Sequence, residues 1–181
     1  LGKYVKVSEE DGGKVISTDF DWTHVASAGH HAFVQVGDET FIAYHTFRNR
    51  LSITDGRALA VDKIVWTTNS EGTEVMHTNG PSWSLQPLPE AISGYKNIAT
   101  SATLTTSAEG ADASLLTDGL IKYQYNDLVK EFEADAGEYT FTLSWDSLKT
   151  ARAIMVYNSM DYFYAFDAVK SIEIEYARSD G

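Results

Sequence analysis

The chain has 181 residues, enough for one ordinary domain or two small ones, and its 43% hydrophobic and 22% charged content is typical of a globular protein. The net charge is −12, from 14 basic and 26 acidic residues, and no Lys/Arg cluster is present that would neutralise phosphates, so we expect no nucleic-acid partner. No apolar run approaches the ~18–20 residues that span a bilayer, which predicts no membrane span. The absence of cysteine excludes disulfides and zinc–thiolate sites.

Short alternating or apolar runs bounded by Gly, Asp, Asn and Ser recur along the chain, and helical periodicity is nearly absent, which predicts an all-β fold. The runs "HAFVQV" and "TFIAYHTF" flank "GDE", a pattern that predicts a β-hairpin with its turn at Gly37–Glu39. We expect a third strand in "RALAVDKIVWTT", a turn in "NSEGTE" and a further strand in "VMHTNG". Three or four such strands form a meander, the unit of a propeller blade or of a sandwich sheet.

The composition changes at Pro81, because all three prolines of the chain fall between this residue and Pro89. Residues 81–96 are therefore the natural crossing between two domains. Beyond them, we expect strands in "GEYTFTLSWD", "ARAIMVYNS" and "VKSIEIEYA", which together indicate a β-sandwich. The intervening "LIKYQYNDLVKEFEA" has some helical character, but a loop or an irregular strand fits it equally well.

Three histidines, His30, His31 and His45, fall within the predicted hairpin. Imidazole is a common metal ligand and acid–base group. Adjacent residues of an extended strand point to opposite faces, so at most one of His30 and His31 is expected to face a site. No H-E-x-x-H or G-x-S-x-G pattern accompanies them, and spacing alone favours a structural role for each.

Sequence motifs in the first half of the chain resemble those of a known family. "AGHHAFVQVGDETFIAYHTF", then "DGRALAVDKIVW" and "NGPSWSLQPLP", over roughly residues 1–89, resembles the last blade of family 43 glycoside hydrolases. The resemblance implies part of a five-bladed β-propeller with its active site in the central funnel, and inverting hydrolysis by two carboxylates. In the family those carboxylates lie upstream of the Gly-His element, so no catalytic residue is expected in this chain.

Two residues match positions that serve the family's site. His30 matches a histidine that in many members helps to hold a central calcium ion through water. Arg57 matches an arginine that hydrogen-bonds substrate, a role suited to a charged group with fixed donors. The alternative for Arg57 is an ion pair with Asp55 or Asp62. His31 and His45 are expected to be structural.

The second half is similar to discoidin-like domains of the coagulation-factor type C group, which are galactose-binding-like sandwiches. "NIATSATLTTSAEGADASLLTDG" carries the similarity, with Asn97, Ala99, Ala102, Ser107, Asp118 and Gly119 in register. Sugar binding by loops at one end of the sandwich is implied, as is a structural calcium near the Asp-Gly turn, with Asp118 as a ligand. A plain turn is the alternative reading of Asp118. The tyrosines that could stack on sugar rings, or simply pack, are Tyr123, Tyr125, Tyr162 and Tyr164.

Together these features predict the C-terminal part of a propeller over residues 1–89, a linker over 90–96, and an incomplete carbohydrate-binding sandwich over 97–181. Because the chain begins at Leu1 and not at Met, we expect it to be a piece of a longer protein. That protein is expected to be a secreted, periplasmic or bacterial cell-surface glycosidase acting on plant polysaccharides that carry arabinose or xylose. Its partners would be a polysaccharide or oligosaccharide and the upstream blades of the same protein. The alternatives are a non-catalytic carbohydrate-binding or adhesion module and an inactive propeller scaffold.

Overall fold

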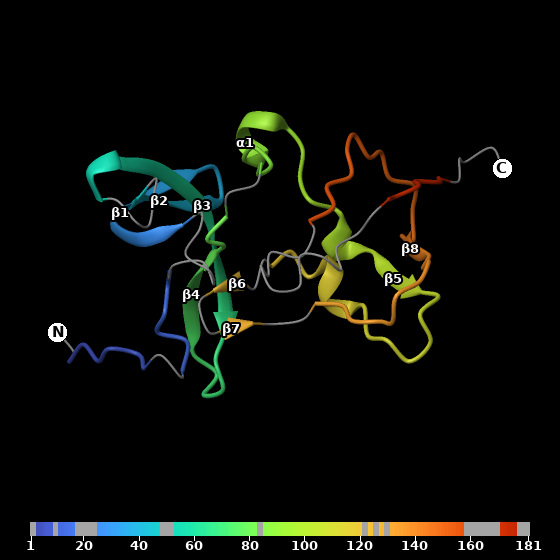
Figure 1. Ribbon diagram of the computed structural model, residues 1–181, viewed down its shortest axis with the longest axis horizontal. Helices are drawn as coiled ribbons and strands as arrows, with labels where there is room; N and C mark the ends of the chain where they lie inside the picture. The colour runs from blue at the N-terminus through green and yellow to red at the C-terminus, as the bar shows by residue number, and fades with distance from the viewer. Residues whose placement is uncertain are drawn as a thin grey trace. The chain divides into compact units, whose positions relative to one another are not determined.

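The computed structural model, drawn in Figure 1, consists mostly of antiparallel β-structure with almost no helix, which confirms the all-β prediction. The residues that the structure describes are 3–8, 11–16, 25–47, 53–82, 85–120, 123–124, 127–128, 131–157 and 171–176. The chain divides into two compact units, Leu1–Lys96 with Leu120–Val129, and Asn97–Gly119 with Lys130–Gly181. Within the described residues, no helix is long and apolar enough to cross a membrane.

The first unit is built on a four-stranded antiparallel meander in the order β1-β2-β3-β4. Its strands are β1 (Ala26–Val36), β2 (Glu39–Phe47), β3 (Arg57–Thr68) and β4 (Glu74–Asn79). These are the strands that the alternating sequence predicts. A 3₁₀ turn, η1 (Ile53–Asp55), precedes β3, and a two-residue pair of β6 (Tyr123–Gln124) and β7 (Asp127–Leu128) also belongs to this unit.

The turn residues of the meander set its register. Val36 pairs with Glu39, so Gly37 and Asp38 alone make the β1–β2 turn, and the predicted turn is confirmed with Glu39 opening β2. Gly37 has a φ of 60°, which a type II′ turn requires at its first central position and which glycine adopts without steric cost. Between β3 and β4, the side chain of Asn69 accepts hydrogen bonds from the backbone N–H groups of Glu71 (3.0 Å) and Thr73 (2.9 Å).

One face of this sheet forms a closed core. Ile42, Tyr44 and Ile64 alternate with outward-facing neighbours along β2 and β3, and together with Val25 they are at most 4% exposed. The segment 11–16 runs beside β4, where the backbone N–H of Thr78 donates to the carbonyl of Val15 at 2.8 Å. Every second residue at these positions of β2 and β3 is therefore buried on this face, as the alternating sequence predicts.

A buried carboxylate lies at the edge of the core. Asp62 on β3 is 2% exposed and accepts hydrogen bonds from the Tyr44 hydroxyl at 2.7 Å and from the backbone N–H and hydroxyl of Ser82. Burial raises the pKa of Asp62, and the hydrogen bonds from Ser82 and Tyr44 oppose that rise. Gly80 allows the close approach, since a Cβ there would lie 2.8 Å from Asp62 Oδ1. Asp62 thus ties β2, β3 and the segment after β4 together.

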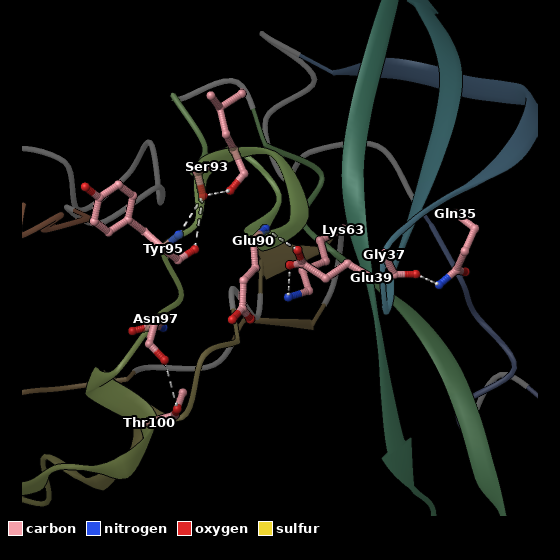
Figure 2. A network of polar contacts seen from close by, with 10 residues as sticks. Gln35, Gly37, Glu39, Lys63, Glu90, Ser93, Tyr95, Asn97 and Thr100 are labelled. Atoms are coloured by element: carbon pink, nitrogen blue, oxygen red, sulfur yellow. Dashed lines mark hydrogen bonds and ion pairs between the residues drawn. The ribbon is translucent and has the colours of Figure 1, made fainter.

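The proline-rich segment contains a short helix, α1 (Glu90–Ser93), inside the stretch predicted as a linker. Gly94 ends it in the left-handed conformation, with its N–H donating to the carbonyl of Glu90. Figure 2 shows how Glu39 holds this helix: one carboxylate oxygen pairs with Lys63 Nζ at 2.7 Å, and the other accepts the Glu90 N–H at 2.6 Å. The hydrogen bond from Lys63 lowers the pKa of Glu39. Helix α1 is therefore fastened to β2.

The second unit has a smaller sheet, in which β5 (Thr103–Thr106) pairs with β8 (Phe141–Ser144). The 3₁₀ turns η2 (Ala99–Ser101) and η3 (Ser114–Thr117) flank β5 along the chain. Phe132 packs edge-on against Tyr139 and Phe141, with ring centroids 6.2 and 5.0 Å apart. The Trp145 indole N–H donates to the carbonyl of Ile98 at 3.0 Å.

Only one of the three strands predicted for this unit is present in the described residues. β8 lies within "GEYTFTLSWD", but the backbone of residues 151–157 and 171–176 is in no strand, so the prediction for these residues is wrong. Their apolar side chains, continuous over 153–157 and alternating over 171–176, are exposed, Ile154 and Ile174 among them. Apolar and β-branched residues favour a strand, but a strand forms only where the backbone of a partner strand supplies its hydrogen bonds.

Candidate functional site

A row of aromatic and basic side chains crosses β1, β2 and β3 at one end of the meander. The ring centroids of His30 and His45 are 6.3 Å apart, and those of His45 and Phe47 are also 6.3 Å apart. The guanidinium carbon of Arg57 lies 5.6 Å from the centroid of the Phe47 ring. We call His30, His45, Phe47 and Arg57 the histidine–arginine row. It brings the two residues that the first resemblance singles out, His30 and Arg57, to one side of one sheet.

The register explains why the row forms. Gly29 pairs with His45, and Phe47 pairs with Arg57, and residues paired across antiparallel strands share a face. Because side chains alternate along β2, this face is the one opposite to the buried Ile42 and Tyr44. Gly29 leaves space above the strand, so that a Cβ there would only touch the His45 ring at 3.7 Å.

A bulge in β1 positions His30. The register shifts by one residue between Gly29 and Ala32, and His30 has a φ of 50°. Positive φ is uncommon outside glycine and costs about 1–3 kcal/mol, and bulges of this kind re-aim a side chain and occur often beside functional sites. The rings of His30 and His31 then meet different neighbours: His31 packs against Phe33 at 5.2 Å.

The electrostatics of the row are positive in a chain of net charge −12. Within the residues that the structure describes, Arg57 forms no ion pair with Asp55 or Asp62, and the Asp62 carboxylate is held by Tyr44 and Ser82. Burial lowers the pKa of His45, and electrostatic interactions with Arg57 and then His30 lower it further. The row therefore presents hydrogen-bond donors to solvent.

Beyond the row, the same face of the sheet is apolar and open. Leu59, Val61 and Val34 are 78%, 50% and 45% exposed, and they follow the row toward the β1–β2 turn. Three exposed apolar side chains therefore lie on one face of the sheet. The meander thus offers apolar side chains on both faces, one closed and one open.

The second predicted metal residue, Asp118, follows η3 and directly precedes Gly119, whose φ is 81°. In the part of the chain that the structure describes, no three His, Cys, Asp or Glu side chains gather where they could hold a metal ion, around His30 or around Asp118. The described residues do not by themselves supply a calcium ligand set, so calcium binding stays a prediction. Tyr125, Tyr162 and Tyr164, and the side chain of Tyr123, lie outside what the structure describes.

Sequence reasoning missed an open pocket in the second unit. Its volume is about 370 Å³, and it lies where the loop after β5 meets the loop before β8. Its walls are Ala108–Ala111 and residues 133–135, with the Tyr139 ring, and its charged groups are Glu109, Glu133 and Asp135. The Tyr139 hydroxyl donates to the carbonyl of Asp135 at 2.7 Å and fixes the loop. The sequence signal was the acidic, aromatic-flanked stretch "EFEADAGEY".

The chain was compared with known proteins at three levels. No family model matches it, no curated protein matches it, and no solved structure matches it.

Proposed function

We propose that the chain is the C-terminal part of a glycoside hydrolase that acts on plant polysaccharides bearing arabinose or xylose. In this proposal the first unit is the last blade of a β-propeller of the family 43 type, and its histidine–arginine row faces the substrate funnel. The observation that carries the proposal is the row itself, since His30 and Arg57 come from separate strands and lie on one open face, linked by the rings of His45 and Phe47.

Each member of the row has a chemical task. Arg57 presents fixed N–H donors to sugar hydroxyls, and its charge persists at every physiological pH. The Phe47 ring holds the guanidinium in place by a cation–π contact. His30 would orient a water or a hydroxyl at the inner end of the blade. The catalytic acid and base would belong to blades upstream of this chain.

The open apolar face supports the blade assignment. A propeller blade packs between neighbours and therefore needs apolar side chains on both faces, whereas a sheet at a domain surface has polar residues on its outer face. Val34, Leu59 and Val61 supply the second apolar face. The upstream blade would cover it, next to the row.

The second unit would be a galactose-binding-like sandwich that holds the enzyme on its polysaccharide. The open pocket between the two loops, about 370 Å³ and bordered by the fixed Tyr139, is where this unit would bind sugar in the proposal. The same pocket also fits the alternative, a non-catalytic carbohydrate-binding module in which both units bind glycan without turnover.

Two assays test the proposal. We expect the 181-residue chain to bind arabinoxylan oligosaccharides weakly in calorimetry and to release no p-nitrophenol from its arabinofuranoside or xyloside. Arg57→Gln should weaken that binding, whereas the matched change Arg152→Gln in the second unit should leave it unchanged. Turnover by this chain would overturn the placement of the catalytic carboxylates upstream of it, and binding that does not change in Arg57→Gln would overturn the assignment of the row.

A further inference from the structure

We propose that the histidine–arginine row recognises the carboxylate of an acidic sugar, a uronic acid carried as a side group on the polysaccharide. This inference rests on the proposed function and goes beyond it, because it names the chemical group that the row selects.

The first argument is the balance of donors and acceptors. A guanidinium only donates hydrogen bonds, and each imidazole contributes at least one N–H. Within the residues that the structure describes, Arg57, His30 and His45 make no hydrogen bond and no ion pair; the His45 ring lies between those of His30 and Phe47, and the Arg57 guanidinium lies over the Phe47 ring. A sugar hydroxyl is both donor and acceptor, whereas a carboxylate only accepts, so a site made chiefly of donors favours the carboxylate.

The second argument is charge. The chain carries 26 acidic and 14 basic residues, and its other described cation on this face, Lys63, is neutralised by Glu39 at 2.7 Å. A guanidinium that has no ion pair among the described residues, in a row with two imidazoles, is an exception on such a surface. The planar fork of an arginine matches the two oxygens of a carboxylate, and such bidentate, charge-assisted pairs are about twice as strong as neutral hydrogen bonds.

The third argument is the setting of the charge. Leu59 pairs with His45 and is 78% exposed, so an apolar side chain flanks the donors. A pyranose ring presents C–H groups as well as its carboxylate, and it can pack those groups on Leu59 and on the His45 ring while the carboxylate meets Arg57. A small inorganic anion would gain nothing from this apolar neighbour, and this favours an acidic sugar.

Calorimetry with the full 181-residue chain tests the inference. The probes are a xylo-oligosaccharide with one glucuronic acid side group and the unsubstituted oligosaccharide of the same length. We expect the acidic oligosaccharide to bind roughly tenfold more tightly, and Arg57→Gln to remove that preference. Arg57→Lys should restore only part of it, because an ammonium cannot pair with both oxygens. Arg152→Gln is the matched control, and circular dichroism checks that each variant is folded.

The outcomes separate this inference from the proposed function. Equal binding of the two oligosaccharides would overturn the inference and leave the proposed function intact, whereas binding of neither would overturn both. A preference that survives in both Arg57→Gln and His45→Gln would place acid recognition elsewhere and overturn the inference. Competition by acetate or inorganic phosphate as strong as that by glucuronic acid would show a general anion site and contradict the acidic-sugar assignment.

Discussion

The described parts of the two units differ in how many large apolar side chains they bury. In the first unit, Val25, Ile42, Tyr44 and Ile64 form a buried cluster beneath the meander. In the described part of the second unit, the buried apolar side chains are those of Ala108 and Ala113, while the larger Phe141 and Leu143 on β8 stay partly exposed. Within the described residues, apolar side chains are buried where four strands pair in register and stay partly exposed on the two-stranded sheet. The following predictions are ordered by expected size.

The largest difference should appear when one isoleucine is truncated in each unit. Ile42→Ala removes a fully buried side chain, leaves a cavity, and should lower the free energy of unfolding by about 2–5 kcal/mol. Ile154→Ala removes an exposed side chain and should change it by less than about 0.5 kcal/mol. Urea unfolding followed by circular dichroism measures both. Equal losses would show that the second unit has a core comparable to that of the first.

Removing a tyrosine hydroxyl sharpens the comparison. Tyr44→Phe deletes the donor to the buried Asp62 carboxylate, and should cost about 1–3 kcal/mol because a buried charge loses a partner. Tyr139→Phe deletes a hydrogen bond to the carbonyl of Asp135 in an exposed loop, and we expect a cost of at most about 1 kcal/mol. The same urea titrations decide, and a harmless Tyr44→Phe would contradict the role given to the buried network.

The pH dependence of stability should differ between the wild type and Asp62→Asn. Burial raises the pKa of Asp62 in the folded state above its usual 3.8. Between pH 3.8 and this higher folded-state pKa, the folded protein therefore binds more protons than the unfolded protein. Asp62 therefore makes the protein more stable as pH falls through the folded pKa toward 3.8. We would measure the urea midpoints of the wild type and of Asp62→Asn from pH 7 to pH 4. The wild-type midpoint minus the Asp62→Asn midpoint should rise as the pH falls, and a difference that does not change with pH would contradict a buried carboxylate with a raised pKa.

The smallest effect concerns the clasp between Glu39 and helix α1. Glu39→Gln removes the charge that pairs with Lys63 and weakens the acceptor for the Glu90 N–H, and we expect it to cost less than about 1 kcal/mol. Hydrogen exchange should nevertheless report faster exchange at the Glu90 amide. The substitution Glu138→Gln, at an exposed residue, is the control. Unchanged exchange at the Glu90 amide in Glu39→Gln would contradict the role of Glu39 in holding helix α1.

The meander could be predicted from the sequence because alternation and turn chemistry act locally. "HAFVQVGDETFIAYHTF" specifies two strands and a glycine turn, and the structure confirms them. The bulge at His30 could not be predicted, because period-two reasoning assumes extended backbone at every residue, whereas His30 has a φ of 50°. The strand predicted over residues 151–157 is absent for another reason: their apolar run shows that they suit a sheet, but not whether a partner strand is present.

The candidate site was predictable only in part. The resemblance named His30 and Arg57, but His45 was expected to be structural, since its place depends on the pairing of Gly29 with His45 across two strands. The place of Phe47 in the row likewise depends on register, because Phe47 pairs with Arg57 across β2 and β3. Such juxtapositions follow from register, which local patterns constrain but do not determine.

The central claim is that the histidine–arginine row binds sugar. Chemical-shift mapping of the 181-residue chain with an arabinoxylan oligosaccharide tests it most directly, by following the imidazole signals of His30 and His45 and the guanidinium signal of Arg57. We predict saturable shifts at these three side chains and none at the indole N–H of Trp145. Shifts that avoid the row, or no shifts up to millimolar sugar, would contradict the account.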